Sequence, residues 1–158
     1  KAEHGLLLPS TEDISLAAEA QALFDFYEAL ADEKGVSLYL TGEGHVAGDR
    51  LMLRRAISNL LSNALRYTPT QGQVRIEIGA TGELVTLSVE NTGAVISPEL
   101  LPHLFDRFFR ADKSRAHPET DGAGLGLSIT RAIVQAHGGT ASVSSSDGKT
   151  RFTLAFPA

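Results

Sequence analysis

Three polar side chains in one stretch of the chain carry groups that can act on a metal ion and on phosphates. Asn59, Asn63 and Arg66 are spaced at i, i+4 and i+7, which places them on one stripe of a helix. An amide oxygen is a hard ligand that suits Mg²⁺, whose other ligands are usually water and phosphate oxygens. Arg66 supplies a cation for the phosphates. The alternative is that these residues form only the polar flank of a helix that packs on the core.

A glycine-rich run leads into a later helix. Its sequence is Gly-Ala-Gly-Leu-Gly-Leu over residues 122–127. Glycines let backbone N–H groups approach phosphates, and a helix N-terminus adds a partial positive charge. The run lacks the Gly-Lys-Ser/Thr ending of a P-loop and does not closely follow a strand, as a dinucleotide fingerprint would. An ordinary loop is the competing interpretation.

Two further segments carry polar or aromatic groups beside turns. Asn91 and Gly93 follow a strand pattern, and a polar side chain at a strand end can read the edge of a base. Aromatic residues over 105–109 lie at the start of a charged stretch, 106–121, whose cations, Arg110 among them, can meet phosphate charge. A loop of that length is usually functional or disordered. Taken alone, the first segment could equally be an ordinary strand-end turn. The aromatic residues could serve only core packing, and the charged stretch could be a solvated basic loop.

Hydrophobic periodicity places these segments on helices and strands. We expect helices over residues 17–34, 50–67, 98–105 and 122–137, with Gly35 and Asp49 as caps. The apolar face of the first helix holds Ala20, Leu23, Phe24, Tyr27 and Leu30, and that of the second holds Leu53, Ile57, Leu60, Leu61 and Ala64. Strands are expected over 36–40, 46–48, 74–78, 84–90, 141–145 and 150–156, with turns at 41–44, 79–82 and 147–148. This mixed order predicts an α+β protein built as a two-layer α/β sandwich.

The composition fits one compact domain and excludes several functions. The chain has 158 residues, of which 42% are hydrophobic and 21% charged, an ordinary globular balance. It has no cysteine, which excludes disulfide frameworks and thiol catalysis. The net charge of -5 shows no basic excess of the kind that nucleic-acid binders carry. We expect residues 1–14 to be a leading segment, with a short strand near 13–16, and residues 15–158 to form the domain.

In their order along the chain, these segments resemble the four boxes of the catalytic domain of sensor histidine kinases. That domain belongs to the ATPase superfamily that includes gyrase, Hsp90-type and MutL-type ATPases. Residues 59–69 are similar to the N box, 91–96 to the first glycine box, 105–109 to the F box and 122–127 to the second glycine box. Residues 148–152 resemble the closing segment. The resemblance spans residues 10–157, and within it 53–69 and 104–112 look closest to the heavy-metal (copper or silver) sensor kinases.

The resemblance implies a Bergerat-type fold that binds Mg-ATP, a mixed sheet of about five strands covered on one face by about three helices. Asn63 would coordinate the Mg²⁺ of the nucleotide, and Asn59 would support it directly or through water. Arg66 and Tyr67 would face the phosphates and the nucleotide edge, and the loop 106–121 would be the ATP lid. The other implied nucleotide contacts are Asn91, Gly93, Ile96, Phe105, Arg110, Gly122, Gly124, Leu125, Gly126, Leu127 and Thr150.

Two residues depart from the family pattern in the first glycine box. Asn91 stands where the family usually has an Asp that accepts a hydrogen bond from the adenine amino group. An amide oxygen still accepts but has no charge, so we expect weaker adenine binding. Val95 replaces a second glycine, which predicts a tighter loop.

The resemblance favours a kinase over a hydrolase. Hydrolytic relatives carry a water-activating Glu where this chain has Asn59, which is a poor general base, so we expect low ATPase activity. No histidine stands in a setting like that of the family's phosphate acceptor, whether His4, His45, His103, His117 or His137. Two alternatives stay open: a degenerate regulatory module that binds nucleotide without catalysis, and an ATP hydrolase of the same superfamily.

The resemblance also implies partners and a location. The partners are the dimerisation and histidine-phosphotransfer domain of the same kinase, from whose helical hairpin residues 1–14 would lead, and a response regulator. We expect the isolated domain to be a monomer and the whole kinase a homodimer. The domain would be cytoplasmic, within an inner-membrane protein, and would contact neither the membrane nor nucleic acid. We expect no copper or silver site, because a periplasmic part would do the sensing.

Overall fold

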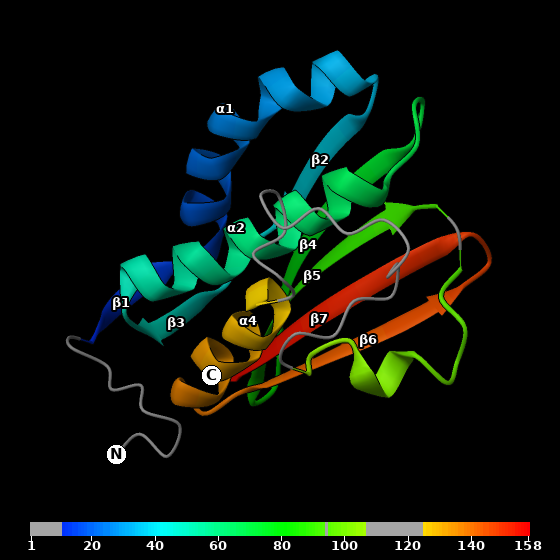
Figure 1. Ribbon diagram of the computed structural model, residues 1–158. Coiled ribbons are helices and arrows are strands. Elements are labelled where there is room, and N and C mark those ends of the chain that lie inside the picture. Colours follow the sequence, from blue (N-terminus) through cyan, green and yellow to red (C-terminus); the bar gives the residue numbers. More distant parts are fainter. Residues whose placement is uncertain (1–10, 94, 107–124) are drawn as a thin grey trace.

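The computed structural model describes residues 11–93, 95–106 and 125–158, and in this part three helices cover one face of a five-stranded sheet (Figure 1). The elements are β1 (Glu12–Ser15), α1 (Leu16–Lys34), β2 (Ser37–Gly42), β3 (His45–Gly48), α2 (Arg50–Tyr67), β4 (Gln73–Thr81), β5 (Leu84–Thr92), the 3₁₀ turn η1 (Leu101–His103), α4 (Leu125–Ala136), β6 (Thr140–Ser146) and β7 (Lys149–Pro157). The predicted α+β sandwich is therefore confirmed.

The sheet is mixed, with strand order β2-β4-β5-β7-β6. Strands β2 and β4 pair in parallel, and the other neighbours pair antiparallel. Alternate residues of β4 and β7 are buried beneath the helices, and Val74, Ile76, Phe152 and Leu154 are among them. This period-2 burial is the pattern expected of a sheet that is covered on one face.

Strands β1 and β3 form a separate two-stranded sheet. Ile14 lies opposite Val46 in their register, and both side chains are buried in the core. The strand expected near residues 13–16 is thus present one residue earlier and packs with the rest of the fold. The remainder of the predicted leading segment, residues 1–10, lies outside the described residues.

Helix α1 begins and ends at caps. The Ser15 side chain accepts a hydrogen bond from the Ala18 N–H, and Gly35 ends the helix in the left-handed conformation (φ 74°), as predicted for a C-cap. The predicted apolar face was wrong at Leu30, which is 48% exposed, whereas Ala31 is buried. The buried residues follow the line Ala20–Phe24–Tyr27–Ala31, and Leu30 lies to one side of it.

Helix α2 has the predicted bounds, and its whole predicted apolar stripe is buried. Asp49 caps its first turn by accepting from the Met52 N–H at 3.0 Å. Two polar contacts join it to α1: Arg54 donates to the buried Glu19 carboxylate at 2.8 and 2.7 Å, and the Tyr27 and Ser58 hydroxyls lie 2.8 Å apart. These contacts fix how far α2 can rotate or slide against α1.

Several predicted boundaries were wrong. No α-helix spans 98–105; the chain makes only the 3₁₀ turn η1 there, because an interior proline at 102 would lack an N–H and clash with the preceding turn. Strand β2 continues through part of the predicted turn 41–44, and β4 and β5 leave only Gly82 and Glu83 between them. The turn predicted at 147–148 is present, with positive φ at Asp147 and Gly148.

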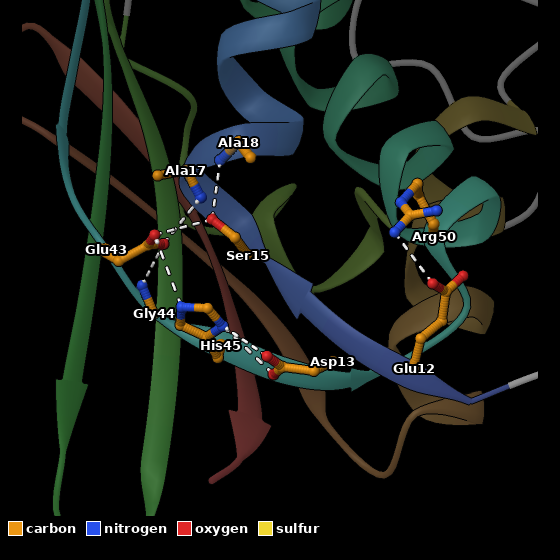
Figure 2. Close-up of polar contacts among 9 residues, drawn as sticks. All are labelled: Glu12, Asp13, Ser15, Ala17, Ala18, Glu43, Gly44, His45 and Arg50. Carbon is orange, nitrogen blue, oxygen red and sulfur yellow. Dashed lines mark hydrogen bonds and ion pairs between the residues drawn. The ribbon is translucent and has the colours of Figure 1, made fainter.

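The N-terminus of α1 is capped by a carboxylate from the β2–β3 connection (Figure 2). Glu43 accepts from the Ala17 N–H at 3.1 Å, the Gly44 N–H at 2.8 Å and the Ser15 hydroxyl at 2.8 Å. Partial burial raises the pKa of Glu43, but these hydrogen bonds and the neighbouring His45 outweigh it, so the pKa lies below its ordinary value. The folded state therefore favours the Glu43 carboxylate.

Glu43→Gln is expected to lower the Tm at pH 7 by no more than about 4 °C, because the half-exposed carboxylate contributes under about 1 kcal/mol. A lowered pKa means that this stabilisation is complete above 4.5, the ordinary value, and is lost as the pH falls through the lower folded pKa. Thermal unfolding of wild type and variant, compared at pH 7 and at an acid pH below the folded pKa, should therefore converge at the acid pH. Glu28→Gln, exposed on α1, is the control. An equal difference in Tm between wild type and variant at both pH values would contradict this account.

Candidate functional site

Helix α2 presents the three predicted polar residues beside its core stripe. Asn59, Asn63 and Arg66 are all partly exposed, whereas Leu60, Leu61 and Ala64 are buried. The packing of the apolar stripe therefore fixes the direction of the polar stripe. The spacing predicted this arrangement on one helix face.

Asn59 joins α2 to the start of α4. Its Nδ2 donates to the Gly126 carbonyl at 3.1 Å, and the Thr130 hydroxyl donates to the same oxygen at 3.0 Å. A Cβ built on Gly126 would lie 3.9 Å from Cγ of Asn59, so this side of the glycine faces the polar stripe of α2. The structure thus brings together the segment predicted to bind metal and the glycine run predicted to bind phosphate. Asn59 and Gly126 are 67 residues apart in the chain.

Asn63 lies one turn beyond Asn59 on the same stripe. Within the described residues, no hydrogen bond engages its side chain, so its amide is not committed to holding the fold together. A part-buried amide that makes no hydrogen bond to the described residues, one helical turn beyond Asn59, is a group available to a ligand. Asn59 differs, because its amide nitrogen is used in the α2–α4 contact while its oxygen keeps its acceptor capacity.

The end of α2 meets the end of β5. Asn91 is buried, and its Nδ2 donates to the Thr92 carbonyl at 3.0 Å. A Cβ at Gly93 would lie 3.0 Å from the Tyr67 carbonyl, which is tighter than most real Cβ contacts. Gly93 therefore lets these two segments approach closely without a shift of the Tyr67 carbonyl. Tyr67 itself is 48% exposed.

The segment after β5 is fastened to the β6–β7 hairpin. The Ile96 N–H donates to Ser145 Oγ at 2.8 Å, and Ser145 Oγ lies 2.8 Å from the hydroxyl of the buried Thr150. Thr150 also lies opposite Asn91 in the β5–β7 register. Ser145 thus joins Ile96 to Thr150, and the sheet register brings Asn91 beside them. Sequence reasoning missed Ser145, for which the sequence offers no motif.

Phe105 lies in the core. It is buried, and its ring meets that of Phe152 edge-on with centroids 5.8 Å apart. The guanidinium of Arg131, on α4, lies 6.0 Å from the Phe105 ring centroid. Sequence reasoning also missed Arg131, which places a cation close to the point where the chain leaves the described residues at 106.

A second contact joins α2 and α4 at the opposite end from Asn59. His137, which is buried, accepts from the Asp49 N–H at 3.1 Å through Nε2, and its Nδ1 donates to the Ile133 carbonyl at 2.8 Å. Both ring nitrogens are therefore used structurally. The two antiparallel helices are tied at both ends, which fixes the position of Gly126 against the polar stripe of α2.

Several predicted site residues cannot be placed. Arg110, Gly122 and Gly124 lie outside the described residues, as do all of the predicted lid after Asp106 and most of the F box. Leu125 is the first residue of α4, and the partly buried Leu127 packs against the core.

The described residues offer oxygen ligands but no self-sufficient metal site. No group of three or more His, Asp or Glu side chains among them is arranged to hold a metal ion. The amide oxygens of Asn59 and Asn63 are the hard donors at the junction of α2 and α4, and these fit a Mg²⁺ that takes its other ligands from water and phosphate.

No helix in the described part of the chain is long and apolar enough to cross a membrane.

A mixed sheet lies under three helices, and α2, which carries Asn59 and Asn63, packs against the start of α4 at Gly126. This arrangement is typical of a nucleotide-binding domain of the α/β sandwich type. Residues 48–158 match the family described as histidine kinase-, DNA gyrase B-, and HSP90-like ATPase, and the chain belongs to this family. The family and fold class predicted from the sequence are therefore confirmed.

Individual relatives agree with this membership. The chain is 50% identical to the sensor histidine kinase CusS of Escherichia coli O6:H1 over 159 residues, covering 100% of this chain and 33% of CusS. It is 50% identical over 139 residues to the probable sensor protein PcoS of Escherichia coli, covering 88% of this chain and 30% of PcoS. The full-length structure of ShkA in complex with AMPPNP matches with a TM-score of 0.82 and 25% identity, over 96% of this chain and 32% of ShkA. The chain thus spans about a third of the length of these relatives.

Proposed function

We propose that the chain is the catalytic domain of a two-component sensor histidine kinase, which binds Mg-ATP and passes the γ-phosphoryl group to a histidine on a separate dimerisation domain. One observation carries most of the proposal: the Asn59 amide bonds to the Gly126 carbonyl at 3.1 Å. That contact sets the polar stripe of α2 against the start of α4, and the N-terminus of a helix favours phosphate. The ShkA structure, of the same fold, holds the ATP analogue AMPPNP.

The described residues divide the work of binding. Asn63, whose amide makes no hydrogen bond to another described residue, offers its oxygen to Mg²⁺, and Asn59 assists while holding Gly126 in place. The bound Mg²⁺ would neutralise phosphate charge, and Arg66 would add to that neutralisation. The buried Asn91, with Thr150 opposite it in the sheet, would form the base pocket beside Gly93 and Ile96. Tyr67 would border the nucleotide, Phe105 would support the lid from the core, and Gly122, Gly124 and Arg110 would contribute from the segment between 106 and 125.

Asn59 favours transfer to a histidine over hydrolysis. A hydrolase needs a base to take a proton from the attacking water. An amide takes no proton at neutral pH, and the nitrogen of this amide is already committed to Gly126. The domain would therefore position the phosphates without activating water, which leaves the phosphoryl group for a nucleophile from another domain.

The rest of the proposal concerns the parent kinase. Its partners would be the dimerisation and phosphotransfer domain and, through that domain, a response regulator. The histidine kinase ThkA has the same fold, and its crystal structure in complex with the response regulator TrrA is an assembly of that kind. The domain would be monomeric and cytoplasmic, within a homodimeric inner-membrane kinase. The likeness of residues 53–69 to heavy-metal sensor kinases supports a metal ion as the signal.

Calorimetric titration of the domain with ATP, with and without Mg²⁺, tests the proposal. We expect saturable binding that Mg²⁺ strengthens, and little phosphate release from the bound ATP. Mixing the domain with a dimerisation domain from a relative such as CusS should then give acid-labile phosphohistidine.

Each outcome separates the candidate functions. Binding without transfer to any hairpin would favour a regulatory module, and steady phosphate release would favour a hydrolase. Absence of ATP binding, with or without Mg²⁺, would overturn the proposal.

A further inference from the structure

The last turn of α2 depends on donors from outside the helix. A helix leaves its final carbonyl groups without intrahelical partners, and α2 ends at Thr68 in extended backbone (ψ 125°) before Pro69. The Thr68 hydroxyl donates to the Ala64 carbonyl at 2.6 Å. The next two carbonyls, those of Leu65 and Arg66, take their hydrogen bonds from a different helix.

That external donor is Lys34, the last residue of α1. Its Nζ donates to the Leu65 carbonyl and, at 3.3 Å, to the Arg66 carbonyl. A cation at this position also interacts favourably with the negative end of the α2 dipole. Lys34 is therefore an ammonium cap supplied to α2 by a residue 31 positions earlier in the chain.

Backbone hydrogen bonds next to Lys34 hold the end of α1 in place. The Gln71 N–H donates to the Gly35 carbonyl at 2.7 Å, and the Ser37 N–H donates to the Gly72 carbonyl at 3.1 Å. These bonds join the end of α1 to the segment that follows α2. The lysine is partly buried, so its side chain does not move freely in solvent.

The capped turn is the part of α2 that carries Arg66 and Tyr67. The Tyr67 carbonyl also packs against Gly93, where a Cβ would lie only 3.0 Å away. A turn that frayed or shifted would thus move Arg66 and disturb the contact with the segment containing Asn91. Lys34 controls these positions without itself belonging to the polar stripe of α2.

We propose that Lys34 is a positioning residue for nucleotide binding: by capping the C-terminus of α2 it holds Arg66 and Tyr67 where they meet the nucleotide. This inference rests on the proposed function, because it gives Lys34 a role only through residues assigned to the nucleotide site. It makes nucleotide affinity depend on a residue of α1 that lies outside the polar stripe of α2.

Lys34→Met keeps the length of the side chain and removes its charge and donors. We expect Mg-ATP affinity to fall on the order of 5-fold, from loss of a charge-assisted helix cap. Lys34→Arg, which can still donate to both carbonyls, should restore affinity to within about 2-fold of wild type. Amide hydrogen exchange in the last turn of α2 should speed up in the Met variant and not in the Arg variant.

Ser15→Ala is the matched control, because it removes the cap at the other end of α1. It should lower the Tm through loss of a helix N-cap and leave Mg-ATP affinity unchanged. An unchanged affinity in Lys34→Met, or an equal loss in Ser15→Ala, would overturn the positioning role while wild-type binding stands. Failure of the wild-type domain to bind Mg-ATP would instead overturn the proposed function.

Discussion

Asn63→Ala is expected to weaken Mg-ATP binding by at least about 30-fold, or about 2 kcal/mol, while leaving the fold intact. Of the two amides on the α2 stripe, that of Asn63 makes no hydrogen bond to another described residue, whereas that of Asn59 is bonded to Gly126. Mg²⁺ loses affinity steeply when a protein ligand is removed, because it demands near-ideal geometry and has few protein ligands here. Calorimetric titration of the variant with ATP, with and without Mg²⁺, measures the effect.

The comparison without Mg²⁺ makes this prediction specific. If Asn63 acts on the metal, the variant should lose the strengthening by Mg²⁺ and keep the weak metal-free affinity. Glu28→Ala is the control, since Glu28 is exposed on a different helix, α1. The Tm of both variants should stay close to that of wild type. Normal Mg-ATP binding by Asn63→Ala would show that the assignment of the α2 stripe is wrong.

The sequence was sufficient to predict the elements that are encoded locally. The buried stripe of α2, its Asp49 cap and the Gly35 cap of α1 were all predicted correctly, because each depends on residues within a few turns of one another. The predicted stripe Asn59–Asn63–Arg66 followed from the same 3.6-residue period. The site was therefore predictable to the extent that one helix carries it.

Contacts between distant segments were not predictable in the same way. Lys34 caps α2 across 31 positions, Ser145 fastens Ile96 across 49, and His137 holds Asp49 across 88. A single sequence carries no signal for such pairs, because lysine, serine and histidine are common on surfaces as well as at caps. The fold decides which of them meets a backbone group.

The errors in the predicted elements have local causes. Leu30 fits a helical repeat at the margin of the α1 stripe, and only the packing of α1 on its neighbours decides that Ala31 is buried instead. The helix predicted over 98–105 does not form, because Pro102 lacks an N–H and its ring clashes within a helix interior, which outweighs the apolar spacing of the segment. Tertiary packing decides the first case and backbone sterics the second.

Gly126→Val is expected to reduce affinity for Mg-ATP by at least about 100-fold, or about 2.7 kcal/mol. The α-hydrogen side of Gly126 faces Asn59, and an added Cβ would already lie 3.9 Å from Cγ of that residue. The two further methyl groups of valine would fill the space between α2 and α4, where phosphates would approach the backbone N–H groups. They would also press on the Asn59–Gly126 hydrogen bond.

Gly126→Ala provides the graded control, because 3.9 Å is an ordinary van der Waals distance. We expect it to cost no more than about 3-fold in affinity. Glycine is also a weaker helix former than either replacement, so neither variant should unfold α4, and circular dichroism can verify this. A large loss with valine and a small one with alanine would locate the phosphates at this face of Gly126. Equal affinities in wild type and the valine variant would mean that phosphate is bound elsewhere, and that Asn59 serves only to join the two helices.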